Sequence, residues 1–339
     1  MLKLLNKYKK WLIIFSFVYI YIILMLIAPS GFVALTPGGI SETNHQYQIE
    51  NVSFNNDINT VSVFSWSKLT TFQKWLIEKN DKYDVYKETD SYKDLSMSDR
   101  RKQGNISHES SQDNAIITAY YYANLEDSKI TIDYTLESLT VYHSNTNKLK
   151  VGDIIKEIND VKITSNSYEE FLKNANVFDY LRPSVIKGKD NYTMKIIRND
   201  KEEIINLTSS EVVQYFPKYK IKSSSPSYKG FNKELNVGGP SGGAMQTLAI
   251  YSALTNVSFG KLKIAGTGTI ETNDTFKVGE IGGLVQKFYT VKHAKVDHFI
   301  IPKSQYKEIS HLIKEATFEI HQVETFDDLI DFTREYQVN

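Results

Sequence analysis

The chain has 339 residues, of which 41% are hydrophobic, and its 40 basic and 40 acidic side chains cancel to a formal net charge of zero. This length and composition allow about two domains with real cores and give no broad basic face for nucleic acid. The chain contains no cysteine, which excludes disulfides, thiolate zinc sites and a cysteine nucleophile.

Four lysines within residues 1–10 precede an uncharged stretch over residues 11–34. Its most apolar part, residues 11–28, would rise about 27 Å as a helix, close to the ~30 Å hydrocarbon core of a bilayer. The pattern predicts a cytoplasmic tail over residues 1–10 and a transmembrane anchor over residues 11–34, with the rest of the chain outside, because flanking lysines stay in the cytoplasm. A cleaved signal peptide starts in the same way, but the run is longer than a usual signal core.

Local patterns predict turns, strands and helices in the first 125 residues. The Thr-Pro-Gly-Gly sequence at residues 36–39 predicts a turn just outside the membrane. Residues 47–52 and 60–65 are rich in β-formers and predict a hairpin with its turn near residues 55–57. Helices are expected at residues 69–78, in the charged segment 87–108, and at residues 111–123, where an apolar stripe consists of Ala115, Ile116, Ala119 and Ala123.

Short β-rich runs dominate from about residue 130 to residue 207. Gly152-Asp153 predicts a turn before a buried strand, and Asn159-Asp160 and Asn199-Asp200 predict two-residue hairpin turns. A helix is expected at residues 168–175. Beyond residue 212 strand and helix patterns alternate.

A glycine-rich sequence around Ser241 precedes an apolar helical run at residues 248–254. Glycines on both sides of a serine allow close backbone approach, and free N–H groups at a helix start can form an oxyanion hole. These features suggest Ser241 as a nucleophile; the plain alternative is a helix N-cap after a Gly-Pro turn. Phosphate loops also precede helices, but their G-x-x-x-x-G-K-[ST] pattern is absent from the chain, so no ATP site is expected.

A serine nucleophile needs a base, and none of the seven histidines stands in a recognisable triad setting. Lys287 follows a second glycine-rich turn and lies early in an expected helix, beside Leu284 and Val291. Burial there would lower its pKa from about 10.4 towards the range in which an amine accepts a proton; the alternative is an ordinary surface lysine. The Thr267 hydroxyl could hold the lysine ammonium or Ser241, or serve only a turn or strand.

These stretches together resemble the proteolytic domain of Lon-type serine proteases. The family's motifs correspond to Gly239-Pro240-Ser241-Gly242-Gly243, Thr267-Gly268-Thr269-Ile270 and Gly282-Gly283-Leu284-Val285-Gln286-Lys287, and Phe299-Ile300-Ile301-Pro302 looks like the family's later strand ending in proline. The resemblance implies a Ser241–Lys287 dyad without metal or cofactor, supported around the oxyanion by Gly239, Pro240, Gly242 and Thr267. Gly242 is a departure, because alanine is commoner there; glycine should loosen the helix start by ~1 kcal/mol or less.

A second departure is that no ATPase module precedes these motifs, which is similar to the membrane-anchored PDZ–Lon proteases of Gram-positive bacteria. Residues 110–115, Ser-Ser-Gln-Asp-Asn-Ala, resemble a segment found there before the PDZ domain. The resemblance implies an α+β Lon-type proteolytic domain with an inserted PDZ-like β-rich domain after one transmembrane helix. Its expected parts are residues 45–125 for the N-terminal part of the protease, 126–210 for the PDZ-like domain and 211–339 for the catalytic part.

Residues 149–163 resemble the core pattern of PDZ domains, which take extended peptides by strand addition. The loop that holds a peptide carboxylate is then expected at residues 136–142, with Leu139, Thr140 and Val141 at the peptide. This segment lacks the usual glycine, so a spacer or lid is the alternative role.

The implied activity is that of an ATP-independent serine endopeptidase outside the membrane, acting on peptides or unstructured protein segments. No nucleic acid or nucleotide partner is expected, and because Lon-type cores often form rings, a homo-oligomer is allowed. Two other classes stay open: a membrane-tethered PDZ peptide-binding protein with an inactive protease core, and a cell-envelope scaffold.

Overall fold

The computed structural model describes residues 2–88, 95–163, 168–179, 185–232, 238–272 and 275–338. The chain forms two compact units. The first unit consists of Met1–Gly39, Ser62–Leu95 and Gly283–Thr290, and the second unit of Ile40–Val61, Ser96–Gly282 and Val291–Asn339.

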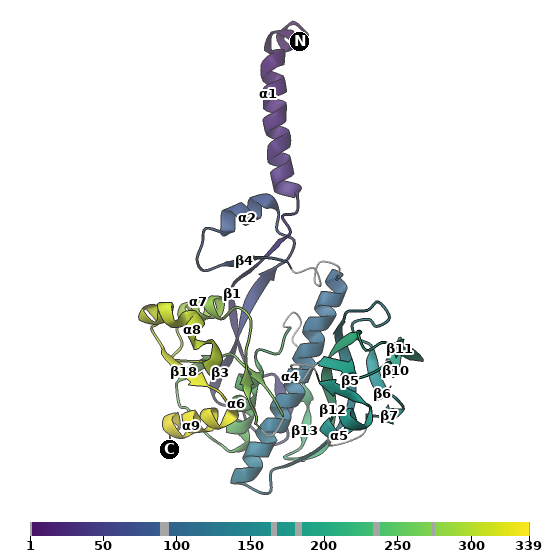
Figure 1. The fold of residues 1–339 in the computed structure, drawn as a ribbon. Helices are drawn as coiled ribbons and strands as arrows, with labels where there is room; N and C mark the ends of the chain where they lie inside the picture. The colour runs from purple at the N-terminus through teal and green to yellow at the C-terminus, as the bar shows by residue number, and fades with distance from the viewer. Residues whose placement is uncertain are drawn as a thin grey trace. The chain divides into compact units, whose positions relative to one another are not determined.

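The first unit begins with a long apolar helix, α1 (Leu2–Ile27), drawn in purple in Figure 1. Its segment Lys7–Ile27 is long and apolar enough to cross a membrane, and none of that segment is buried in the protein. A membrane span and a signal sequence both meet this description. The helix ends earlier than the predicted limit of residue 34, because the chain enters strand β1 (Phe32–Glu42) there.

The rest of the first unit is built around β1. This strand pairs antiparallel with β4 (Asp84–Lys87), and on its other side lies β3 (Asp57–Trp66), whose later half belongs to this unit. The turn predicted at residues 36–39 is therefore wrong, since these residues continue β1. A Cβ on Gly38 would collide with the Ser62 carbonyl. Glycine at this position therefore lets β1 and β3 approach each other closely, and the Pro-Gly-Gly sequence makes no turn.

Helix α2 (Thr71–Ile77) confirms the helix predicted at residues 69–78. Thr70 caps it: the Thr70 hydroxyl accepts a hydrogen bond from the Gln73 amide, and the Gln73 side chain accepts one from the Thr70 amide. No residue of α2 is buried. The first turns of α7 (Leu284–Ala294) complete the unit.

The second unit contains a sheet of parallel strands in the order β18-β17-β14-β3. The added strands are β14 (Lys263–Gly266), β17 (His298–Pro302) and β18 (Glu319–Val323). Strand β17 is buried along its whole length, as expected for a central parallel strand. Three short helical segments follow β17: η1 (Lys303–Gln305), α8 (Tyr306–Ile309) and η2 (Ser310–Glu315).

Three helices accompany this sheet: α4 (Met97–Glu126), α6 (Gly243–Leu254) and α9 (Phe326–Tyr336). Every residue of α6 is buried, so this helix lies inside the core. The helices predicted in the charged segment and at residues 111–123 are one helix, α4, and its predicted apolar stripe is fully buried. Residues 89–94 of the charged segment lie outside the described residues.

The hairpin predicted between residues 47–52 and 60–65 is wrong. Strand β2 (Tyr47–Ile49) pairs antiparallel with β13 (Tyr228–Phe231), and β3 pairs in parallel with β14. One hydrophobic core joins residues from both ends of the chain, including Ile58, Ile116 and Met245. Both strands thus pair with segments distant in the sequence. A further small ladder joins β15 (Thr269–Ile270) and β16 (Val278–Gly279).

The β-rich part of the second unit spans residues 131–225 and forms a separate sheet in the order β11-β10-β6-β5-β12-β9-β8, with β7 paired to β6. It encloses its own core, from Leu136 to Tyr215. Its elements are β5 (Thr131–Ser144), β6 (Ile154–Ile158), β7 (Val161–Lys162), α5 (Tyr168–Asn174), β8 (Val177–Asp179), β9 (Val185–Gly188), β10 (Tyr192–Arg198), β11 (Lys201–Leu207) and β12 (Val212–Ser225). Both predicted hairpin turns are confirmed, with positive φ angles at all four Asn and Asp residues.

The loop predicted at residues 136–142 is wrong, because these residues form the middle of β5. Leu139 and Thr140 pair with β12 on one side and with β6 on the other. Val141 pairs with Tyr215 of β12 and is fully buried. Since backbone hydrogen bonds are made on both sides, strand addition of a peptide at these residues has no free edge to use.

Candidate active site

Ser241 lies in the turn that leads into α6, within the second unit. The N-cap position of α6 is occupied by Gly242, and no side chain caps the helix. The alternative interpretation of Ser241 as a helix N-cap is therefore wrong. Its side chain is half-buried, at the start of a helix that is otherwise enclosed.

The backbone carbonyl of Ser241 is held by two donors. The Gly268 amide donates to it at 2.8 Å, and the Thr267 hydroxyl donates to it at 3.0 Å. The Ala244 amide in turn donates to the Gly268 carbonyl at 3.0 Å, which binds the start of α6 to the same segment. The hydroxyl of the fully buried Thr267 therefore contacts the serine through the serine's main-chain carbonyl.

The glycines beside Ser241 are explained by crowding and backbone angle. Gly239 has φ of +94°, a conformation that L side chains rarely adopt. A Cβ on Gly243 would lie 2.8 Å from the Ser111 hydroxyl, and one on Gly242 would lie 3.0 Å from the Thr60 methyl. The expected loosening of the helix by Gly242 does not arise, because an N-cap lies outside the helix interior and accepts glycine well.

One face of helix α4 contacts residues 238–242, which are called the serine loop here. The Gly104 carbonyl accepts a hydrogen bond from the Gly239 amide at 2.9 Å, and the Ser111 hydroxyl donates to the Pro240 carbonyl at 3.1 Å. Between them, His108 Nδ1 contacts the Gly239 carbonyl at 3.3 Å. Sequence reasoning missed Gly104 and His108. Gly104, His108 and Ser111 are spaced i, i+4, i+7, which places them on one face of a helix. This spacing could have identified them from the sequence.

The backbone amide directly after Ser241, that of Gly242, is a candidate oxyanion donor. Within the ranges that the structure describes, the Gly242 amide donates to no other residue. Its position at the N-terminus of α6 adds the positive end of the helix dipole. Such an amide can stabilise a negative charge that develops on a bound carbonyl oxygen.

Lys287 lies on α7 in the first unit, and only 2% of its surface is exposed. Burial lowers the pKa of its amine from 10.5 to about 7. The predicted desolvation of this lysine is confirmed, and the surface alternative is wrong. The Lys287 amide bonds the Gly283 carbonyl at 2.9 Å, and Gly283 has φ of +70°, which makes the tight turn before the helix.

Polar contacts within the first unit fix the turn of α7 that carries Lys287. The Thr290 hydroxyl accepts a hydrogen bond from the Gly38 amide at 2.9 Å, and the buried Gln286 side chain donates to the Lys82 carbonyl at 3.4 Å. A Cβ on Gly283 would lie 3.3 Å from a methyl group of Leu35. The helix start is thereby held against β1 and against the segment before β4.

Residues 110–115 of α4 connect this helix to the β-rich part of the second unit. Asp113 is largely buried, burial raises its pKa to about 7, and its carboxylate accepts a hydrogen bond from the Tyr219 amide at 3.2 Å. The Gln103 side chain donates to the Tyr142 carbonyl at 2.8 Å. Helix α4 therefore contacts the serine loop and also both long strands of the β-rich part.

The Thr267 hydroxyl bond yields a testable prediction. Thr267→Val keeps the shape but removes a donor to the Ser241 carbonyl, a change of about 1 kcal/mol, so labelling of Ser241 by a fluorophosphonate should slow roughly fivefold. Thr267→Ser keeps the hydroxyl and should label at nearly the wild-type rate. Equal labelling of the valine variant and the wild type would contradict this role.

The comparison with protein families identifies the part of the chain that contains these residues. Residues 234–334 match the model of the Lon protease (S16) C-terminal proteolytic domain, a range that includes Ser241, Thr267 and Lys287. No curated protein matches the chain. The chain thus carries a Lon-type proteolytic domain, which supports a serine protease, together with an N-terminal helix apolar enough to be a membrane span or a signal.

Proposed function

We propose that this protein is an ATP-independent serine endopeptidase in which Ser241 is the nucleophile and Lys287 is its base. The observation that carries the proposal is the burial of Lys287 inside the range that matches the Lon proteolytic domain. Its pKa of about 7 leaves a large share of the amine neutral near neutral pH, and only the neutral amine can accept a proton.

In the proposed mechanism the Lys287 amine takes the hydroxyl proton of Ser241 as the serine oxygen attacks a peptide carbonyl. The Gly242 amide donates a hydrogen bond to the oxyanion. The lysine ammonium then protonates the leaving amine, which releases the first product and leaves an acyl-serine. Water, deprotonated by the same amine, hydrolyses this ester and regenerates the serine.

The proposed substrates are short peptides and unstructured protein segments. The chain contains no phosphate-loop motif with which it could drive unfolding by ATP. A peptide bond reaches a serine inside a protein only in an extended, flexible segment. Exposed protein tails fit this requirement, whereas compact domains do not.

We further propose that the β-rich part is a PDZ-like insertion, as in the PDZ–Lon proteases of Gram-positive bacteria. Its separate core and its position between α4 and β13 support an insertion. The two-sided pairing of Leu139 and Thr140 favours the spacer role over peptide capture at that place. Its hydrogen bonds to α4 connect it to the helix that supports the serine loop.

A membrane-tethered binding protein with an inactive core is the second candidate. A buried amine destabilises a fold, because the charged form loses its hydration. Methionine would fill the same space without that cost, and peptide binding elsewhere gives no reason for a lysine at residue 287. The burial of Lys287 therefore favours the peptidase.

We propose a membrane location with all residues after the anchor on the outer side. The four lysines within residues 1–10, which precede the uncharged run, support this orientation. The membrane location itself also draws support from α2, because the Thr71 amide at the start of α2 donates to the Ala28 carbonyl, just past the end of α1, at 3.0 Å. Trp75 and Leu76 of α2 are exposed, and exposed apolar and aromatic side chains near the end of a membrane span are typical of the membrane–water interface.

Cleavage without nucleotide is the direct test of the proposed function. The full chain in detergent should cleave an unstructured fluorogenic peptide without ATP, and Ser241→Ala should lower the rate at least about 10³-fold, because the nucleophile is lost. Ser310→Ala, a change at an exposed serine, is the matched control and should keep the wild-type rate. Undiminished cleavage by Ser241→Ala would refute the proposal.

The pH dependence tests the base. Because the ammonium dominates below the Lys287 pKa of about 7 and cannot accept a proton, kcat/KM should rise with pH through about 7 and then level off. Lys287→Arg stays charged throughout and should be inactive at every pH, whereas Lys292→Arg, on the same helix, should behave as wild type. A flat pH profile would argue against a lysine base.

Tryptophan quenching tests the position of α2. The chain has three tryptophans, Trp11, Trp66 and Trp75. With Trp11 and Trp66 replaced by Phe, Trp75 fluorescence in vesicles should be quenched by lipids brominated near the headgroup, because α2 lies at the membrane surface. A chain in which only Trp11 is left reports on α1 as the positive control. Quenching of Trp75 by aqueous iodide alone would show that α2 lies off the membrane.

A further inference from the structure

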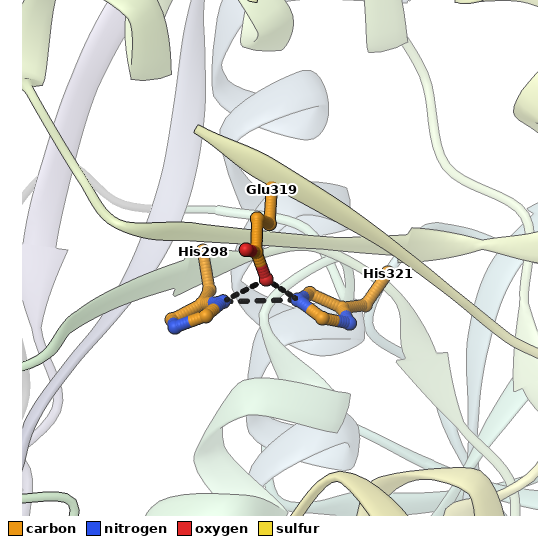
Figure 2. A group of neighbouring side chains, drawn as sticks. All are labelled: His298, Glu319 and His321. Carbon is orange, nitrogen blue, oxygen red and sulfur yellow. Dashed lines mark hydrogen bonds and ion pairs between the residues drawn. The ribbon is translucent and has the colours of Figure 1, made fainter. Parts of the chain in front are cut away.

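Two histidines and a glutamate meet on one face of the parallel sheet in the second unit (Figure 2). His298 lies on β17, and Glu319 and His321 lie on the neighbouring strand β18. The register places His298 opposite Glu319 and Ile300 opposite His321. Because side chains alternate along a strand, all three polar side chains project to the same face.

The three donor atoms form a compact triangle. His298 Nδ1 and His321 Nε2 lie 2.9 Å apart, and Glu319 Oε2 lies 3.5 Å from the first nitrogen and 3.8 Å from the second. Tetrahedral ligands of zinc, each ~2.05 Å from the ion, lie ~3.4 Å apart. Every side of the triangle is within about 0.5 Å of this value. Small side-chain rotations would therefore suffice to surround an ion.

Helix α9 orients the three side chains. The Tyr336 hydroxyl donates to Glu319 Oε2 at 2.9 Å, as an outer hydrogen bond to a metal-binding carboxylate would. The Phe332 ring packs against both imidazoles, with centroids 5.6 Å from His298 and 4.9 Å from His321. The rings are thus held in place by packing. The three side chains are therefore already positioned before an ion binds.

Access for an ion comes from the glutamate side of the cluster. The His298 side chain is 6% exposed, whereas 65% of the Glu319 side chain is exposed. An ion can therefore enter from solvent and keep a water as its fourth ligand. Three protein ligands and one open position form a common arrangement for zinc.

We propose that His298 Nδ1, His321 Nε2 and the Glu319 carboxylate bind one divalent transition-metal ion of the zinc class. Imidazole nitrogens suit zinc, nickel and copper, whereas calcium and magnesium prefer sets made only of oxygen. The ion replaces the hydrogen bond that now joins the two imidazoles, so it links the same two strands more strongly. It fastens β18 and, through Tyr336, α9 to the central strand β17.

Zinc titration of the full, untagged chain in detergent tests this proposal. After treatment with EDTA, calorimetry should find one zinc ion per chain, and zinc should raise the melting temperature. Glu319→Gln and His321→Asn should each weaken the affinity at least tenfold. His311→Asn, a change at an exposed histidine outside the cluster, should leave the affinity unchanged.

Two outcomes would overturn the site: no zinc binding by the wild type, or equal affinity in the wild type, Glu319→Gln and His321→Asn. Cobalt substitution gives an independent readout, because a tetrahedral site produces strong visible absorption that both variants should lose. The same titration with Ser241→Ala should give the wild-type affinity. The result is therefore independent of whether the chain is a peptidase.

Discussion

Lys287 is almost completely buried, and this single constraint sets the protonation behaviour of its amine, on which the proposed peptidase activity depends. A buried ammonium is unstable, so the fold lowers the pKa of this group to about 7. In the unfolded chain the same amine keeps its proton up to about pH 10.4. The unfolded state then binds more protons between about pH 7 and about pH 10.4, so the free energy of unfolding rises with pH over this window and the full cost of burial applies below it.

The serine loop is constrained in a different way, by hydrogen bonds to several of its backbone amide and carbonyl groups. The Ser241 carbonyl has two donors, and the loop before it is bonded to α4 at Gly239 and Pro240. These hydrogen bonds hold the backbone of Ser241 in one position. Positioning of this kind supplies much of the rate in hydrolysis, because the reacting groups need no further ordering. Helix α4 is thus as much a part of the loop's geometry as the glycines beside the serine.

The same helix connects the serine loop with the β-rich part, through Asp113 and Gln103. Helix α4 therefore contacts two parts of the second unit, each of which has its own core. The ligands of the proposed metal site lie on other elements, β17 and β18, where a bound ion would fasten the far edge of the parallel sheet. Stability at that edge matters because an outer strand lacks a partner on one side.

Sequence alone determined the features that depend on neighbouring residues. The apolar run of α1, the stripe of α4 and the two Asn-Asp turns follow from side-chain periodicity and from the φ angles that these residues tolerate. The motif spacing also singled out Ser241 and Lys287. Tertiary structure decided every choice of partner: β2 with β13, β3 with β14, and residues 136–142 inside β5. It also brought His298 on β17 to Glu319 and His321, which both lie on β18. Local patterns specify which face of a strand is buried, but distant segments compete for each strand edge, and only packing of the whole chain selects among them.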